Sequence, residues 1–214
     1  MTVDGIRDAW LGEDPLPPEP VPIVKRWLEE AFEDRSRESP HAVALATVDA
    51  DGRPSVRMVL CDSIDPERGA FTFYTNRASR KGRALEHEPR AGMAFHWPGR
   101  QARVEGRVEW AADAVSDAYF ARRPLEARLG AWASQQSEPV GSRAELVAAV
   151  EAAAERFGAR HEQDIVPRPP HWGGIILVAE SIELWVSRLG RIHDRALWRR
   201  DQPGEAWKIT RLQP

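Results

Sequence analysis

Apolar residues recur along the chain with two periods, and these predict where helices and strands lie. The spacing in residues 23–38 is that of one helical face, so this segment is expected to form an amphipathic helix. The apolar positions of that face are Ile23, Val24, Trp27, Leu28 and Phe32. Residues 14–22 are rich in proline, which removes backbone donors, and a non-helical lead-in is expected there.

The clearest helix is predicted over residues 142–158. Ser142, with Glu145 three residues later, forms a capping-box pattern, and Gly158 suits the C-terminal end. Two shorter helices, each stopped by a proline, are expected over 78–89 and 112–124.

Runs of period two predict antiparallel strands through most of the remaining chain. Residues 41–65 hold two such runs around Asp51-Gly52, which is a hairpin signal. Further strands are expected over 69–75, 91–97, 101–111, 173–200 and 206–212. Many short strands with a few helices indicate an α+β fold, a closed antiparallel β-barrel with helical decoration. We expect one domain over 1–214, in which residues 1–22 form a flexible N-terminal segment.

Composition and charge exclude several classes of protein. The chain has 214 residues, a net charge of -3 and one cysteine, Cys61. No intrachain disulfide can form, and no global positive field is available for nucleic acid. The longest apolar run, IILVA, is far too short to span a bilayer, and the first twenty residues hold no signal-peptide core. A cytoplasmic protein without nucleic-acid or membrane partners is predicted, and its scattered histidines show no metal-ligand spacing. Cys61 is interpreted as a buried core residue, with a reactive thiol as the alternative.

Four basic residues crowd the start of the helix predicted over 78–89. They are Arg77, Arg80, Lys81 and Arg83. Positive charge at a helix N-terminus opposes the helix dipole unless an anion binds there. Helix-terminal amides with arginine forks and a lysine suit a phosphate, and a solvated basic face is the alternative.

A second basic pattern lies in residues 189–198, where Arg191, His193 and Arg195 stand at every second position. If this segment is extended, the three side chains share one face. Because alternate side chains of a strand lie on opposite faces, the segment would present two guanidinium groups and one imidazole together.

Two further segments are candidates for ligand contacts. On one predicted strand, Arg57 and Val59 share one face while Met58 and Leu60 share the other, which alone indicates a half-buried sheet. The small residues of 130–137 allow close approach to the backbone. The polar end of this segment consists of Gln135, Gln136 and Ser137. These side chains can hydrogen-bond to a heterocycle, and a plain polar loop is the alternative.

These pieces occur together in the order and spacing of a known family. The motifs are RMVL, FYTNRASRKG, RQARVEG, AYFARRP, LGAWASQQS, HWGG, ELW and RIHDR, closing with AWKITRLQP. On these motifs the chain resembles the FMN-dependent pyridoxamine 5'-phosphate oxidases, from about Ile6 to the C-terminus. The resemblance implies an antiparallel split β-barrel homodimer with FMN at the subunit interface.

The resemblance also implies which residues bind the cofactor. Those for FMN are Arg57, Met58, Val59, Leu60, Tyr74, Thr75, Arg80, Lys81, Gln101, Gln136, Ser137, Trp185 and Arg195. Of these, Tyr74, Thr75, Arg80 and Lys81 would surround the ribityl phosphate. The basic helix start would thereby gain its anion.

The implied chemistry is oxidation of pyridoxamine or pyridoxine 5'-phosphate to pyridoxal 5'-phosphate. A substrate carbon gives a hydride to flavin N5, and dioxygen reoxidises the flavin with release of hydrogen peroxide. Arg191 and His193 would be the catalytic pair, orienting the substrate ring and stabilising charge at the reacting carbon. Tyr119 and Arg123 would bind the substrate phosphate.

The sequence departs from the family pattern in this phosphate pocket. Asp62 stands where the family usually carries a phosphate-binding lysine, and Ala127 stands where many members carry a serine. Val186 replaces a glutamine near the ring edge. A carboxylate about 4 Å from a phosphate contributes roughly 4 kcal/mol of repulsion at an effective dielectric near 20. Arg128 is a residue that could compensate, or Asp62 could turn toward solvent.

Three functions follow from these observations. The favoured one is a pyridoxamine or pyridoxine phosphate oxidase with an altered phosphate pocket, supported by RIHDR, Tyr119 and Arg123. The second is a related FMN oxidase for another cyclic metabolite, such as a phenazine precursor, supported by the three departures. The third is a non-catalytic flavin-binding or vitamer-binding protein.

Overall fold

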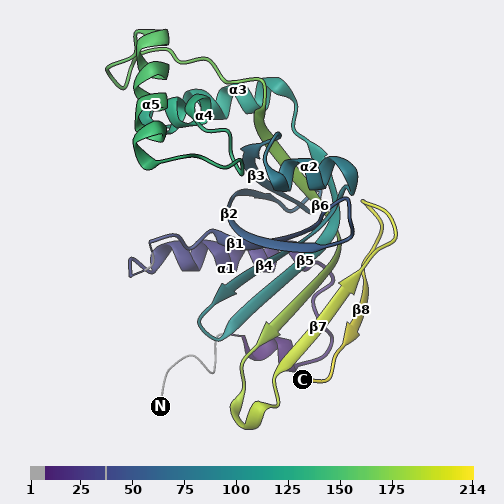
Figure 1. The fold of residues 1–214 in the computed structure, drawn as a ribbon. Helices are drawn as coiled ribbons and strands as arrows, with labels where there is room; N and C mark the ends of the chain where they lie inside the picture. The colour runs from purple at the N-terminus through teal and green to yellow at the C-terminus, as the bar shows by residue number, and fades with distance from the viewer. Residues whose placement is uncertain (1–7, 37) are drawn as a thin grey trace.

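A closed antiparallel barrel forms the centre of the computed structural model, which describes residues 8–36 and 38–214 (Figure 1). Its strands are β1 Ala42–Val48, β2 Pro54–Asp65, β3 Ala70–Asn76, β4 Arg90–Trp97, β5 Arg100–Trp110 and β6 Trp172–Val186. They follow the order β3-β2-β1-β4-β5-β6, and pairing of β3 with β6 closes the ring. Two more strands, β7 Asp194–Arg199 and β8 Lys208–Arg211, continue the sheet from the C-terminal half of β6. The predicted α+β barrel and its hairpin at Asp51-Gly52 are confirmed.

The barrel core follows from the period-two pattern of the strands. Alternate side chains point inward, and the largest apolar ones on β1, β3 and β4 are fully buried. They include Val43, Leu45, Phe71, Phe73 and Phe95. Burial of one such side chain contributes about 1.5–3 kcal/mol, so the pattern of the strands itself supplies the main stabilisation of the barrel.

The N-terminal helix, α1 Val21–Glu33, packs its apolar face on this core. The buried positions are Ile23, Val24, Trp27 and Leu28, as the helical spacing predicts. Phe32 was expected on the same face but is 55% exposed. The helix also begins earlier than predicted, inside the proline-rich segment. Pro22 lies in the first turn, where its missing N–H costs no intrahelical hydrogen bond.

The segment before α1 is described from Asp8 onward. It holds one short 3₁₀ helix, η2 Ala9–Gly12. Trp198 on β7 donates its indole N–H to the carbonyl of Pro17 at 2.9 Å. The expectation of flexibility for residues 1–7 lies outside the described residues.

The remaining helices lie beside the barrel and at one end of it, the upper end in Figure 1. They are α2 Arg80–His87, α3 Asp113–Ala121, α4 Leu125–Ala133 and α5 Arg143–Phe157. The helix α4 was not predicted, because Pro124 was interpreted only as a stop signal and Gly130 as part of a loop. Pro124 instead stands at the N-cap of α4, and Leu125 and Leu129 pack against α5.

The capping box predicted for α5 is confirmed. The Ser142 hydroxyl accepts a hydrogen bond from the Glu145 backbone N–H at 3.2 Å, and Gly158 ends the helix with a left-handed φ of 60°. Because a lost N-cap costs about 1 kcal/mol, Ser142→Ala is expected to lower the melting temperature by about 2–4 °C. Calorimetry would measure this shift. Glu151→Gln, in the exposed middle of α5, should leave the melting temperature unchanged, and an equal fall in both variants would contradict the capping role.

The segment between β6 and β7 is a turn rather than a continuous strand. Leu189–Arg191 forms a single 3₁₀ turn, in which Gly190 has a φ of 69° and Arg191 a φ of 62°. β7 begins only at Asp194. The prediction that Arg191 and His193 alternate with Arg195 on one strand face was therefore wrong, because left-handed backbone at Gly190 ends the extended run.

Candidate functional site

A pocket of basic and polar side chains lies at the start of α2. Lys81 Nζ donates to Gln136 Oε1 at 2.6 Å, and the Thr75 hydroxyl lies 3.5 Å from the same oxygen. The Ser137 hydroxyl accepts from the Arg80 backbone N–H at 3.1 Å. Five residues predicted to bind FMN thus come together from β3, α2 and the loop after α4. With Arg57 they are called the basic pocket here: Arg57, Thr75, Arg80, Lys81, Gln136 and Ser137.

Arg57 reaches this pocket from β2. Its guanidinium donates to the Leu45 carbonyl at 3.0 Å, the Thr47 hydroxyl at 2.9 Å and the Ser55 hydroxyl at 2.8 Å. All three acceptors are uncharged, as are the acceptors of Lys81. Arg57 and Lys81 therefore bring positive charge into the pocket, and no carboxylate of residues 8–36 or 38–214 is hydrogen-bonded to either of them.

The other cations at the start of α2 have partners within the protein. Arg80 forms an ion pair with Asp49 at 2.5 Å, and Arg83 forms one with Glu138 at 3.0 Å. The guanidinium of Arg77 lies over the ring of Trp110 at 4.3 Å from the centroid. Two carboxylates that sequence analysis did not identify thus neutralise part of the positive charge that opposes the dipole of α2.

The electrostatics of the pocket reflect this shortage of negative charge. Burial, followed by the charge of Arg57, lowers the pKa of Lys81 to about 8. Burial, followed by the charge of Arg80, lowers the pKa of Arg57. A bound anion would relieve both effects, since it would favour the charged forms.

A stack of three nearly parallel aromatic rings is built around Tyr74, the residue before Thr75 on β3. The rings of Tyr74 and Tyr119 lie 3.7 Å apart with an interplanar angle of 10°, and the Trp172 ring lies nearly parallel to both, 5.3 Å from Tyr74 and 6.1 Å from Tyr119 between centroids. Gly174 pairs with Tyr74 across β3 and β6. A Cβ at Gly174 would lie 3.0 Å from the Tyr74 ring, so glycine in the HWGG motif makes room for the stack.

Opposite charges flank this stack. The Asp62 carboxylate lies beside the Tyr119 hydroxyl, and burial, followed by the charge of Asp62, raises the pKa values of Tyr119 and Tyr74. The Arg123 guanidinium lies 4.7 Å from the Trp172 ring centroid. Its buried Nη1 has no hydrogen-bond partner among residues 8–36 and 38–214. The predicted substrate-binding residues Tyr119, Arg123 and Asp62 therefore do gather at one place.

Two other residues considered for this site have structural roles instead. Arg128 donates to the backbone carbonyls of Asp164, at 2.7 Å, and Glu162. Because its guanidinium holds the loop after α5, it does not compensate for Asp62, and that hypothesis was wrong. Cys61 is 1% exposed, and burial followed by the charge of Asp62 raises the pKa of its thiol to about 12. Its interpretation as a buried core residue is confirmed.

The other predicted ligand residues form a separate group on β5, β6 and the β6–β7 turn. Gln101 pairs with Trp185, which pairs with Arg195 on β7. The His193 ring packs on Trp185 at 4.7 Å between centroids. Within the described part of the chain, Arg191 is exposed and makes no hydrogen bond or ion pair. Arg195 forms an ion pair with Glu183 at 2.7 Å.

The two groups lie at opposite ends of β6 (Figure 1). Tyr74 pairs with Gly174 near the start of this strand, whereas Gln101 pairs with Trp185 near its end. Eleven residues of extended chain span about 35 Å along the strand. One chain therefore does not bring all the predicted FMN contacts into one site.

The outer face of the sheet is apolar on β2. Val56, Met58 and Leu60 are 66%, 61% and 52% exposed. Met58 and Leu60 were predicted to line the flavin, and their side chains point away from Arg57. One row of cross-strand pairs continues this face through Met58, Ala44, Ala94, Arg103, Glu183 and Leu197. Val186, expected near the ring edge, is buried in the core instead.

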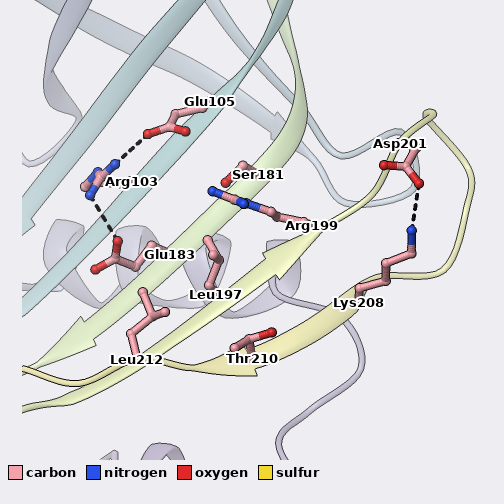
Figure 2. A pocket seen from close by; sticks show the side chains of 10 residues that line it. All are labelled: Arg103, Glu105, Ser181, Glu183, Leu197, Arg199, Asp201, Lys208, Thr210 and Leu212. Atoms are coloured by element: carbon pink, nitrogen blue, oxygen red, sulfur yellow. Dashed lines mark hydrogen bonds and ion pairs between the residues drawn. The ribbon is translucent and has the colours of Figure 1, made fainter.

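A hollow of about 650 Å³ lies on the same face, across β5 to β8. Figure 2 shows the side chains that line it. Arg103 bridges Glu105 and Glu183, and Lys208 pairs with Asp201 at 2.7 Å. The lining includes none of the predicted site residues. Most of its charges neutralise one another, so the hollow offers no anion-binding or cation-binding chemistry of its own.

Comparison with known proteins places the chain in a family. Residues 28–157 match the family model described as pyridoxamine 5'-phosphate oxidase, and residues 172–214 match the pyridoxine 5'-phosphate oxidase C-terminal dimerisation region. The chain belongs to the pyridoxamine 5'-phosphate oxidase family. It is an oxidoreductase of that family, and the predicted resemblance is confirmed.

Named relatives of this oxidase family extend over nearly the whole chain. A pyridoxine/pyridoxamine 5'-phosphate oxidase of Cupriavidus taiwanensis is 50% identical over 206 residues, covering 95% of this chain and 93% of the relative. One from Anaeromyxobacter dehalogenans is 50% identical over 205 residues, covering 94% and 100%. Among solved structures, PhzG from Burkholderia lata in complex with tetrahydrophenazine-1-carboxylic acid has a TM-score of 0.85 and 33% identity, with 100% of both chains covered. An FMN-binding family protein from Nostoc punctiforme shares the fold, with a TM-score of 0.70, 17% identity and coverage of 91% of this chain and 97% of that chain.

No helix in the described residues is both long enough and apolar enough to cross a membrane.

Proposed function

We propose that this protein is an FMN-dependent oxidase that converts pyridoxamine or pyridoxine 5'-phosphate to pyridoxal 5'-phosphate, with dioxygen as acceptor and hydrogen peroxide as product. The observation that carries the proposal is the basic pocket, where, among the residues that the structure describes, Arg57 and Lys81 hydrogen-bond only to uncharged groups. The pocket includes Thr75, the residue after Tyr74 of the aromatic stack on β3, in a chain of the oxidase family. The same membership favours the two oxidase functions over a non-catalytic binding protein.

The donor set of the basic pocket fits the phosphate of FMN. A phosphate dianion in this pocket would accept hydrogen bonds from Lys81 and Arg57 and from the hydroxyls of Thr75 and Ser137. Its charge would favour the protonated form of Lys81, whose pKa is lowered to about 8 by burial. When bound, FMN would supply the hydride acceptor of the reaction.

The remaining FMN contacts would come from a second copy of the chain. Gln101, Trp185 and Arg195 lie at the far end of β6 from the basic pocket, so a homodimer can complete the set at each of two equivalent sites. The exposed apolar residues Val56 and Met58 on β2 support this proposal, since such a face is typical of an interface. The match of residues 172–214 to a dimerisation region supports it too.

Arg191 and His193 are proposed to act on the substrate. The His193 Nδ1 accepts a hydrogen bond from the Arg188 backbone N–H at 3.1 Å. An accepting Nδ1 places the ring proton on Nε2, so the outer edge of the imidazole would donate to the substrate. The guanidinium of Arg191, which is exposed and has no partner among the described residues, would bind an acceptor group beside it.

The reaction is tested by anaerobic stopped-flow mixing of the FMN-loaded protein with pyridoxamine 5'-phosphate. Bleaching of the flavin band, followed by formation of hydrogen peroxide on admission of oxygen, is the expected result. A flavin that stays oxidised with both pyridoxamine and pyridoxine 5'-phosphate would exclude the proposed reaction.

A second candidate is oxidation of another cyclic metabolite, and Asp62 favours it. A carboxylate beside Tyr119 repels a substrate phosphate. The structural similarity to PhzG bound to tetrahydrophenazine-1-carboxylic acid points the same way, because that ligand is a tricyclic acid without a phosphate. If such an acid bleaches the flavin band and neither pyridoxamine nor pyridoxine 5'-phosphate does, this second function is supported.

The shared site predicts complementation between two impaired variants, at an FMN concentration that saturates the parent protein but leaves the Lys81→Met sites largely empty. In a mixed dimer of Lys81→Met and His193→Ala chains, one site carries both substitutions and the other carries neither. Random mixing gives half mixed dimers with one intact site each, so about a quarter of the parent activity is expected. Co-expression of the two chains and an oxidase assay would measure it. Activity no higher than that of the two variants assayed separately would argue against a site built from two subunits.

A cytoplasmic location is also proposed, since the single cysteine suits a reducing compartment.

A further inference from the structure

The N-terminal segment is anchored by the carboxylate of Asp8, which is 3% exposed. Asp8 Oδ1 accepts from the indole N–H groups of Trp10 at 3.2 Å and Trp27 at 3.1 Å. Its other oxygen accepts from the Arg100 guanidinium at the start of β5. A buried carboxylate with this many donors is strongly held, because its removal would leave several of those donors unpaired.

A single side chain connects this anchor to the β6–β7 turn. Arg188 Nη2 donates to the Asp8 backbone carbonyl at 2.8 Å, and Arg188 Nε forms an ion pair with Asp194 at 2.6 Å. Asp194 lies against the backbone of Gly12, where a Cβ would come within 3.3 Å of its carboxylate. The N-terminal segment therefore contacts the turn both through Arg188 and directly at Asp194.

The turn has little apolar support of its own. Leu189 is 97% exposed and Ile192 is 73% exposed. Gly190 and Arg191 both have positive φ, a conformation that is unfavourable for a residue with a side chain such as Arg191. Polar contacts at the base of the turn must therefore define its geometry, and Arg188 makes the main ones.

The same contacts set the orientation of the His193 ring. The backbone N–H of Arg188 donates to His193 Nδ1. The side chain of Arg188 donates through Nε to the carboxylate of Asp194, the residue after His193. Movement of Arg188 would displace the donor that fixes the imidazole tautomer.

We propose that Arg188, held by Asp8, is a positioning residue that fixes the β6–β7 turn and thereby places Arg191 and His193 for reaction. This inference rests on the proposed function for the role of those two residues. Arg188 itself need not touch the substrate. The N-terminal segment would act as a brace for the turn within the same chain.

The test compares Arg188→Ala with Arg188→Lys and with Arg143→Ala, an exposed arginine on α5 remote from the turn. The first readout is the ¹⁵N NMR signature of the His193 ring, which requires no activity. The parent protein is expected to show the tautomer protonated on Nε2, and Arg188→Ala is expected to show averaging between tautomers. Arg188→Lys, which keeps one cationic donor, should restore part of the parent signature.

The second readout is flavin reduction at saturating substrate. Displacement of the turn by even 1 Å is expected to slow reduction about tenfold in Arg188→Ala, with a smaller change in substrate affinity. Arg143→Ala should match the parent. An unchanged His193 signature together with an unchanged reduction rate in Arg188→Ala would overturn the inference. If the parent flavin is reduced by no vitamer, the proposed function fails, and the His193 signature alone then decides the positioning role.

Discussion

Replacement of Lys81 by methionine is expected to weaken FMN binding by about tenfold to a hundredfold at pH 7. Methionine has a similar length but cannot donate, so the complex loses one charge-assisted hydrogen bond to phosphate, worth about 1.5–3 kcal/mol. Fluorescence quenching of FMN on titration with the apoprotein measures the change. Lys25→Met, at an exposed position on α1, is the matched control and should bind as the parent does.

The pH dependence of binding gives this prediction a distinctive form. The pKa of Lys81 is lowered to about 8 in the free protein, because burial disfavours the charged ammonium. Phosphate would raise that pKa, so FMN binding takes up a proton above pH 8. Affinity should fall by up to tenfold per pH unit as pH rises from 8 toward the pKa of the complex, and this slope should vanish in Lys81→Met. A parallel slope in both proteins would assign the proton to another group.

Replacement of Asp62 by lysine is expected to raise kcat/KM for pyridoxine 5'-phosphate about a hundredfold. A carboxylate about 4 Å from a phosphate costs roughly 4 kcal/mol per charge pair at an effective dielectric near 20, and solvent at this exposed residue screens part of it. The substitution removes the repulsion and adds an attraction. Stopped-flow reduction of the flavin over a range of substrate concentrations would measure the ratio.

Two comparisons make the Asp62 experiment specific. Asp62→Asn should give a smaller gain than lysine, because it removes the repulsion alone. Unphosphorylated pyridoxine should react equally with all three proteins. If Asp62→Lys leaves the phosphate substrate unchanged, Asp62 does not face the phosphate, and if it harms a tricyclic acid substrate instead, the second candidate function gains support.

The fold could be predicted to a large extent because its elements are encoded locally. The barrel strands follow period-two patterns, and α5 carries both of its caps in adjacent residues. The failures have local causes too. Pro124 and Pro22 were interpreted as helix breakers, although each occupies a helix start that tolerates proline. The turn at Gly190 was missed because the alternation of basic residues there imitates a strand.

Sequence analysis named several residues that the structure brings together, but it did not predict how they are arranged. Lys81 and Gln136 were both named, and the structure brings them to 2.6 Å across 55 positions of sequence. The ion pair of Arg80 with Asp49 was not foreseen, since Asp49 carries no local signal and meets α2 only after the barrel has closed. The same holds for Thr47 and Ser55, which hold Arg57 through strand pairing rather than through any motif.

The length of β6 has a consequence for how the proposed homodimer would retain FMN. Because one end of this strand lies at the basic pocket and the other at Trp185, each polypeptide of that dimer would carry two unlike halves of a site and complete neither by itself. Association of subunits and retention of flavin would then be thermodynamically linked, so each would strengthen the other by the same factor. Dilution alone should release the coenzyme, and added FMN should hold the subunits together at concentrations where the apoprotein separates.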